Sequence, residues 1–144
     1  SQKKNKPSAE RLKGYRRALE ENGLGVDEKN IFLQNFTIAS GYEGVMALLE
    51  RSKIDGIFCG NDLIAIGAIQ ALKENNLKVP KDVKVIGFDD ISMSQFTDPA
   101  LTTIKQPIYE LGEEAVKMLV AIIDKKDIDM HKVLGTELIE RGSC

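Results

Sequence analysis

Apolar residues follow two alternating patterns along the chain. Longer stretches carry apolar side chains at three- and four-residue spacing, which predicts amphipathic helices. These stretches span residues 8–22, 37 or 40 to 49, 61–72 and 107–124. Short, nearly continuous apolar runs lie between them and predict buried strands at residues 31–33, 57–59 and 83–88, with residues 133–139 as a candidate final strand.

This alternation predicts the fold class. Strands that alternate with helices at such spacing are typical of right-handed βαβ units and a parallel sheet. We therefore expect an α/β fold in which a Rossmann-like parallel sheet is flanked by helices. Residues 89–103 interrupt the alternation and predict a long loop, with a turn at Asp98 and Pro99.

Composition and charge exclude several classes of protein. Hydrophobic residues make up 42% and charged residues 29% of the chain, as in soluble globular domains. The net charge is −2, whereas a domain that neutralises DNA phosphates usually carries a basic patch. No apolar run approaches the ~20 residues of a membrane-spanning helix, and residues 1–10 are polar, unlike a signal peptide. We expect a cytoplasmic protein with no membrane partner.

Residues of the kind that enzymes use are few. Cys59 and Cys144 are isolated, so they predict neither a zinc site nor a disulfide framework, and Cys59 is expected in the core of a protein from a reducing compartment. His131 is the single histidine and is expected in a solvated loop. No nucleophile elbow, zinc-protease motif or phosphate-binding loop occurs. We expect no catalytic residue, no cofactor and no metal.

Polar and aromatic side chains follow the predicted strands at their carboxyl ends. They are Asn35 and Phe36, then Gly60, Asn61 and Asp62, then Asp89 and Asp90. Ligands of open α/β sheets bind at this edge, and Arg11, in the first turn of the first helix, is expected close to it. Carboxylate, amide and guanidinium groups bond adjacent hydroxyls while an aromatic face covers C–H groups, so the set suits a polyhydroxy ligand.

Two other interpretations of these residues are open. Asn61 and Asp62 are good helix N-caps, and this role alone explains their position. Asp62, Asp89 and Asp90 together could hold Mg²⁺. The magnesium interpretation is the weaker one, because no phosphate-binding loop or nucleophile accompanies the carboxylates.

Six short motifs in order resemble those of the LacI/GalR transcription regulators. They are RLKGY at 11–15, FCGND at 58–62, VPKDV at 79–83, VIGFDD at 85–90, PALTTI at 99–104 and ELIER at 137–141. The resemblance spans nearly the whole chain. It implies one lobe of a type I periplasmic-binding-protein-like fold, so that residues 1–144 would form the carboxyl-terminal, effector-binding lobe of a sensor domain.

The resemblance also implies roles for individual residues. A small sugar, pentose or hexose, would contact Arg11, Phe36, Asn61, Asp89 and Gln106, and residues 106–124 would cross to a first lobe outside this chain. A homodimer would use Ile66, Met93 and Phe96. Operator DNA would be read, in repression, by a helix-turn-helix that this chain lacks. The alternative is a lobe of a sugar-binding protein from a transport system.

The predicted helix at residues 107–124 carries an apolar stripe that needs a packing partner. Large apolar side chains are costly to leave in water, so the stripe should be covered. It can fold back onto the sheet of its own chain, or it can pack against or exchange with a second copy, which we favour.

Overall fold

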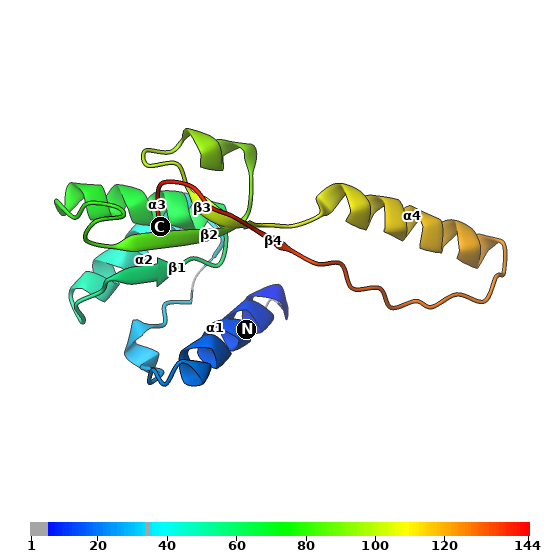
Figure 1. Ribbon diagram of the computed structural model, residues 1–144, viewed down its shortest axis with the longest axis horizontal. Coiled ribbons are helices and arrows are strands. Elements are labelled where there is room, and N and C mark those ends of the chain that lie inside the picture. The colour runs from blue at the N-terminus through cyan, green and yellow to red at the C-terminus, as the bar shows by residue number, and fades with distance from the viewer. Residues whose placement is uncertain (1–5, 34) are drawn as a thin grey trace.

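The computed structural model describes residues 6–33 and 35–144 and shows a four-stranded sheet with helices around it (Figure 1). The helices are α1 (Lys6–Glu21), α2 (Ile38–Leu49), α3 (Asp62–Glu74) and α4 (Ile108–Ile123), with short 3-10 turns η1 (Glu28–Asn30) and η2 (Ser92–Phe96). The strands are β1 (Gly56–Phe58), β2 (Lys84–Asp89), β3 (Thr102–Lys105) and β4 (Glu137–Ile139).

The sheet confirms the predicted α/β class. Its strand order is β1-β2-β3-β4, and the first three strands run parallel. Only β4 is antiparallel to its neighbour. The carboxyl ends of β1, β2 and β3 therefore lie at one edge of the sheet, as the predicted ligand site requires.

The hydrophobic core lies between the sheet and the pair formed by α2 and α3. Val85 of β2 and Leu72 of α3 are fully buried there, and Cys59 is also buried. The two helices approach closely at Gly67, where an added Cβ would lie 1.9 Å from the backbone oxygen of Ile38. Cys59 is thus a small core residue, as predicted.

Helix α1 packs on the other face of the sheet. The ring of Tyr15 on α1 stacks on Phe58 of β1, with centroids 6.2 Å apart and planes 5° from parallel. One turn nearer the start of α1, the Arg11 guanidinium carbon lies 3.8 Å from the centroid of the Phe88 ring. Successive side chains along β1 and β2 therefore point in turn to the face covered by α3 and to the face covered by α1.

Two predictions about strands are wrong. Residues 31–33 pair with no strand among the described residues, so they are extended chain without ladder hydrogen bonds. Residues 89–103, predicted as a loop throughout, contain η2 and the start of β3. Strand β3 escaped prediction because it begins with Thr102 and Thr103, whose buried hydroxyls are each hydrogen-bonded. Such residues do not form the apolar run that signals a buried strand.

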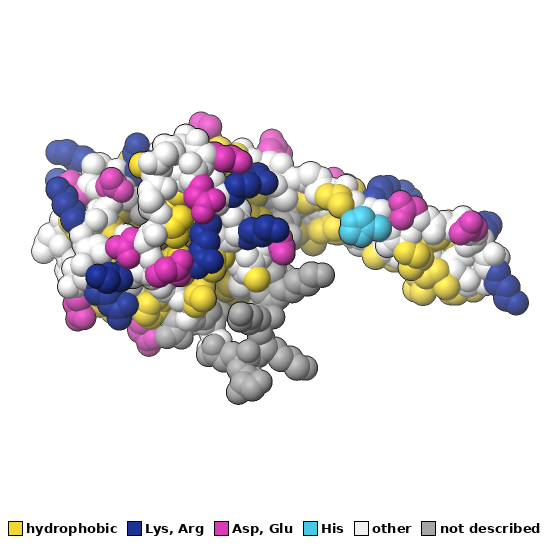
Figure 2. Space-filling model, turned by 90° about the horizontal axis from the view of Figure 1, so that it is seen from below, with side chains coloured by type: hydrophobic (Ala, Val, Ile, Leu, Met, Phe, Trp, Pro, Cys, Tyr) yellow, Lys and Arg dark blue, Asp and Glu magenta, His cyan; other side chains and the backbone are white. Residues whose placement is uncertain are grey.

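Helix α4 projects from the lobe, and residues 125–136 run back beside it to β4 (Figure 1). None of its residues is buried, and yellow apolar side chains gather along this arm in Figure 2. The alternative in which this helix folds back onto its own sheet is therefore wrong. Packing against another copy stays a prediction.

Across the part of the chain that the structure describes, no helix is both long and apolar enough to cross a membrane.

Candidate functional site

Arg11 is the centre of a polar cluster at the carboxyl edge of the sheet. From α1, its Nη1 donates to the backbone oxygen of Gly60 and its Nη2 donates to Asp89 Oδ1 at 3.1 Å. Its guanidinium lies over the Phe88 ring and 5.8 Å from the centroid of Phe36. Cation–π contact and charge-assisted hydrogen bonds together hold this side chain in one orientation.

Asp89 carries the acceptor of the cluster. Gln106, which follows β3, donates from Nε2 to Asp89 Oδ1 at 2.6 Å. Both described donors, Arg11 and Gln106, thus use one oxygen, and Oδ2 accepts from no residue that the structure describes. The side chain is 26% exposed. A ligand hydroxyl can therefore reach an aspartate oxygen whose orientation is already fixed.

Asn61 and Phe36 border the same cluster. The side-chain oxygen of Asn61 accepts from the backbone NH of Ile64 at 3.0 Å, so the cap interpretation is confirmed for this residue. Its amide nitrogen makes no hydrogen bond to a described residue and can donate to a ligand. Phe36 lies against Gly60, where an added Cβ would come within 3.2 Å of its ring.

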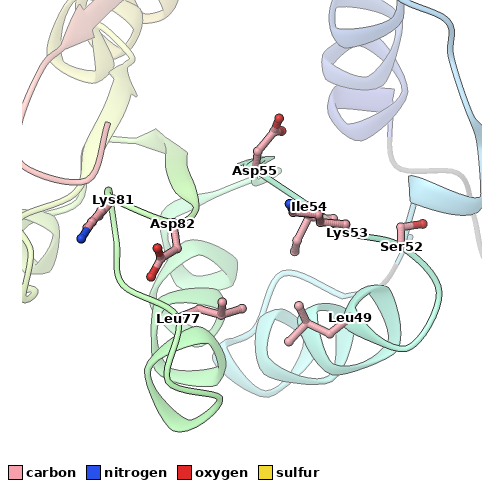
Figure 3. Close-up of a pocket in the computed structure, with 8 residues that line it drawn as sticks. All are labelled: Leu49, Ser52, Lys53, Ile54, Asp55, Leu77, Lys81 and Asp82. Carbon is pink, nitrogen blue, oxygen red and sulfur yellow. The ribbon is translucent and has the colours of Figure 1, made fainter.

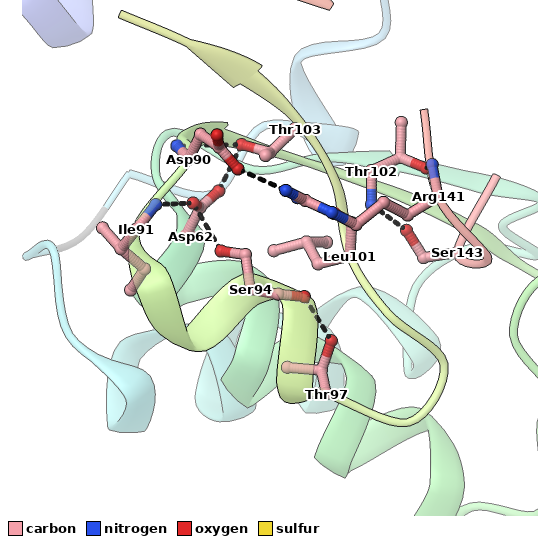
Figure 4. A network of polar contacts seen from close by, with 10 residues as sticks. All are labelled: Asp62, Asp90, Ile91, Ser94, Thr97, Leu101, Thr102, Thr103, Arg141 and Ser143. Carbon is pink, nitrogen blue, oxygen red and sulfur yellow. Dashed lines mark hydrogen bonds and ion pairs between the residues drawn. The ribbon is translucent and has the colours of Figure 1, made fainter. Parts of the chain in front are cut away.

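Asp62 does not cap α3. Its carboxylate is buried and accepts from Ile91 N, Ser94 Oγ and Thr103 Oγ1 (Figure 4). Asn61 takes the cap position instead, one residue earlier. The cap interpretation of Asp62 is therefore wrong.

The carboxylate of Asp90 is also occupied, by Arg141 after β4, whose Nη2 lies 2.7 Å from Asp90 Oδ1. Asp62, Asp89 and Asp90 thus have three separate sets of partners. No group of three or more metal-ligating side chains is found in the described ranges 6–33 and 35–144. The arrangement gives no support to the magnesium alternative.

Sequence reasoning missed two parts of the cluster. The backbone oxygen of Gly60 fixes Arg11, and Phe88 forms the aromatic floor beneath it. Every residue carries a backbone oxygen, so the sequence cannot show that the one of Gly60 binds Arg11. Phe88 could have been found, because it alternates away from the core face of β2 and immediately precedes Asp89.

Neither Cys59 nor His131 forms a hydrogen bond to the Arg11 cluster in the described part of the chain. Burial raises the pKa of the Cys59 thiol to about 12, and the nearby Asp62 carboxylate adds to the shift. The thiolate is thus disfavoured at neutral pH. His131 is exposed in the segment that returns from α4, which confirms the predicted loop position.

The residues predicted for a dimer interface lie on two elements. Met93 and Phe96, on η2, are 51% and 79% exposed. Ile66, on α3, is half-buried. Exposed apolar side chains suit an interface, and the role of all three stays a prediction.

A hollow of about 750 Å³ lies at the opposite end of the sheet (Figure 3). It is lined by Leu49 and Leu77 together with Lys53, Asp55 and other residues of both charges. No member of the Arg11 cluster contributes to it. It sits at the amino end of β1, where parallel sheets do not place their ligands.

The Arg11 cluster has the chemistry of a candidate binding surface. It offers an aspartate oxygen and an amide nitrogen that bond no described residue, together with the aromatic ring of Phe36. The Arg11 charge is offset by Asp89 at 3.1 Å. Such a surface matches an uncharged ligand with several hydroxyl groups and apolar C–H faces.

Comparison with known proteins agrees with this architecture. The family described as "Periplasmic binding protein-like domain" matches residues 1–144. The transcriptional regulator AscG of Escherichia coli strain K12 is 43% identical over 137 residues, covering 94% of this chain and 41% of AscG. The chain thus spans about two fifths of the length of the curated relatives it matches.

Solved structures give the same result. A sugar-binding transcriptional regulator of the LacI family from Escherichia coli, complexed with phosphate, superimposes with a TM-score of 0.92 at 40% identity, covering 100% of this chain and 52% of that one. The CelR–cellobiose complex, a transcriptional regulator, gives a TM-score of 0.90 at 34% identity, covering 94% and 42%. The chain therefore belongs to the periplasmic-binding-protein-like domain family, in the form carried by LacI-type transcriptional regulators.

Proposed function

We propose that this chain is the carboxyl-terminal, effector-sensing lobe of a LacI-type transcriptional repressor that responds to a small neutral sugar. The observation that carries the proposal is the cluster of Arg11, Asp89 and Gln106 at the carboxyl edge of the parallel sheet. Three elements far apart in sequence converge there and leave one aspartate oxygen for a ligand. The chain acts by binding, not by catalysis.

The charge of the cluster supports a neutral effector. Arg11 is already paired with Asp89 at 3.1 Å and donates to Gly60. A phosphorylated sugar would have to displace Asp89 or face its carboxylate, since like charges at this distance repel. A neutral pentose, hexose or disaccharide instead donates hydroxyls to Asp89 and stacks its C–H face on Phe36.

We also propose that residues 106–124 cross to a first lobe and that operator DNA is read by a further part of the protein, in the cytoplasm. The exposed apolar side chains of α4 support the crossing, because they match a surface that another lobe covers. A transport-type sugar-binding lobe is the alternative, and the transcriptional regulators among the relatives of this chain favour a regulator over it.

A homodimer through Ile66, Met93 and Phe96 is part of the proposal. The exposure of Met93 and Phe96 on η2 supports it. Sedimentation of the full-length protein with Phe96→Asp should show dissociation, while Gln95→Asp, an exposed neighbour, should not. A dimer that survives Phe96→Asp would place the interface elsewhere.

The full-length protein tests the function directly. DNA that it selects from a random duplex pool serves as the operator, and its release is measured by fluorescence anisotropy with ribose, glucose and cellobiose. We expect one of these neutral sugars to lower DNA affinity, because an effector acts through its different affinities for two conformations. Failure to bind any DNA would contradict the proposal, and so would DNA binding that no sugar changes.

A further inference from the structure

The turn that carries Asp89 has an unusual backbone. Asp89 and Asp90 have φ angles of +110° and +52°, in regions that residues with side chains seldom adopt. Alternation along β2 would place Asp89 on the α3-facing side, with Val85 and Gly87. The turn redirects its carboxylate to Arg11 of α1 instead. Whatever holds the turn therefore sets the direction of the candidate ligand acceptor.

Asp62 is the buried group that holds this turn. It is 0% exposed, it begins α3, and it is not the helix cap. Its Oδ2 accepts from the backbone NH of Ile91 at 2.9 Å and from Ser94 Oγ at 2.7 Å. Ile91 is the last residue of the turn and Ser94 lies in η2, which follows it, and Figure 4 shows both donors converging on one carboxylate.

The second oxygen of Asp62 reaches the turn through Thr103. Thr103 Oγ1 donates to Asp62 Oδ1 and accepts from the backbone NH of Asp90 at 3.4 Å. The Asp62 carboxylate is therefore bound to Ile91 directly and to Asp90 through one hydroxyl. A buried carboxylate with three donors is rigid, because each broken bond leaves an unpaired polar group in the interior.

The close approach of Asp62 to β2 depends on Gly87. A Cβ added there would lie 2.2 Å from Asp62 Oδ1 and 2.9 Å from Leu101 Cδ2. Only a residue without a side chain leaves room for the carboxylate beside the strand. The position of the Asp62 carboxylate thus depends on the glycine at position 87.

We propose that Asp62 is a positioning residue of the effector site: it fixes the Asp89–Ile91 turn and so aims the Asp89 carboxylate. Asp62 does not touch the ligand. This inference rests on the proposed function, because it assigns Asp62 a role in the same site. It also predicts a backbone effect that can be measured without any ligand.

Thr103→Val in the full-length protein tests the proposal while leaving Asp62 in place. It removes the hydroxyl that links Asp62 to Asp90 and nearly preserves side-chain volume. The dissociation constant is measured by calorimetry for whichever of ribose, glucose and cellobiose the unaltered protein binds. We expect it to rise about tenfold or more, since small misplacements of a binding group are costly. Amide hydrogen exchange at Asp90 and Ile91 should accelerate by a similar factor.

Two variants separate positioning from stability. Thr103→Ser restores the hydroxyl and should restore both affinity and slow exchange. Ser143→Ala is the matched control, because this buried hydroxyl bonds the backbones of Val85 and Thr102 and forms no hydrogen bond to the Asp89–Ile91 turn. It should lower stability as Thr103→Val does, yet change affinity by no more than about twofold, the variation expected for groups that share no partner.

The outcomes are distinct. Thr103→Val with unchanged affinity and unchanged exchange overturns the proposal, and so does an equal loss of affinity in Ser143→Ala. If the unaltered protein binds none of the three sugars, the proposed function fails. The exchange rates alone then test whether Asp62 fixes the turn. Slow exchange at Asp90 and Ile91 in Thr103→Val would then still overturn the role of Asp62.

Discussion

At the scale of the residue, the sequence predicted which side chains converge but not how they are held. Arg11, Asp89 and Gln106 meet as expected, although Gln106 was placed there only by the family resemblance. The roles of Asn61 and Asp62 could not be separated from sequence. Both residue types cap helices, and only the structure shows that Asp62 turns inward to donors 29 and 41 residues away.

The two cysteines should differ sharply in reactivity. The pKa of Cys59 is raised to about 12 by burial, whereas Cys144 is exposed. Because only the thiolate reacts, the native chain at pH 8 should take up one equivalent of iodoacetamide, at Cys144, and a second only after denaturation. Mass spectrometry of the labelled peptides measures this. Rapid native labelling of Cys59 would contradict the burial described above.

At the scale of the element, periodicity located the four helices and the strands β1 and β2, because each carries its apolar residues in a regular helical or strand pattern. It failed where other interactions replace apolar burial. Strand β3 is stabilised by neighbours on both sides and by buried hydroxyl groups, so its sequence carries no apolar run. Residues 31–33 have the run but no pairing partner in the described part of the chain.

Close packing of α2 on α3 makes Gly67 sensitive to any side chain. In Gly67→Ala the new methyl would overlap backbone atoms of Ile38 and Tyr42, which cannot move independently. We expect urea denaturation to show a loss of about 2–3 kcal/mol, the upper part of the range of roughly 1–3 kcal/mol for overpacking. Gly14→Ala is the control, since nothing lies within 4 Å of its Cβ position in α1. It should raise stability by up to ~1 kcal/mol, and an equal loss in both would contradict the packing.

The apolar side chains of α4 should cause the isolated chain to self-associate. Val116, Leu119 and Ile123 are each more than half exposed, and burying each is worth ~1.5–3 kcal/mol. We expect sedimentation to show concentration-dependent association that Leu119→Lys with Ile123→Lys abolishes. Glu110→Gln, also exposed on α4, changes charge without removing apolar surface and should have no effect. A monomer at high micromolar concentration would contradict this expectation.

At the scale of the whole molecule, the proposed arrangement makes this chain one lobe that carries one wall of a site. It spans about two fifths of the length of its curated relatives, and its site opens at the carboxyl edge of the sheet. The fold class followed from alternation of strands and helices. The identity of the sugar could not follow from either sequence or structure of this lobe, because an opposing wall also contacts the ligand in the proposed arrangement.

The isolated 144-residue chain should therefore bind sugars much more weakly than the full-length protein. A missing wall removes three or four hydrogen bonds of ~1 kcal/mol each, which corresponds to roughly a hundredfold or more in the dissociation constant. Titration calorimetry of both proteins with the same sugar measures the ratio. Equal affinity would mean that this lobe holds the complete site.

The most direct test of the central claim is the response of the full-length protein carrying Asp89→Ala. Asp89 offers its free oxygen to the effector and lies far from any DNA-reading element in the proposed arrangement. Operator affinity without sugar should stay unchanged, while the sugar concentration needed for half-release should rise at least ~10-fold, the cost of a hydrogen bond to a charged group. Asp82→Ala, an exposed carboxylate at the other end of the sheet, should behave like the unaltered protein. Release of Asp89→Ala at the unaltered sugar concentration would contradict the account.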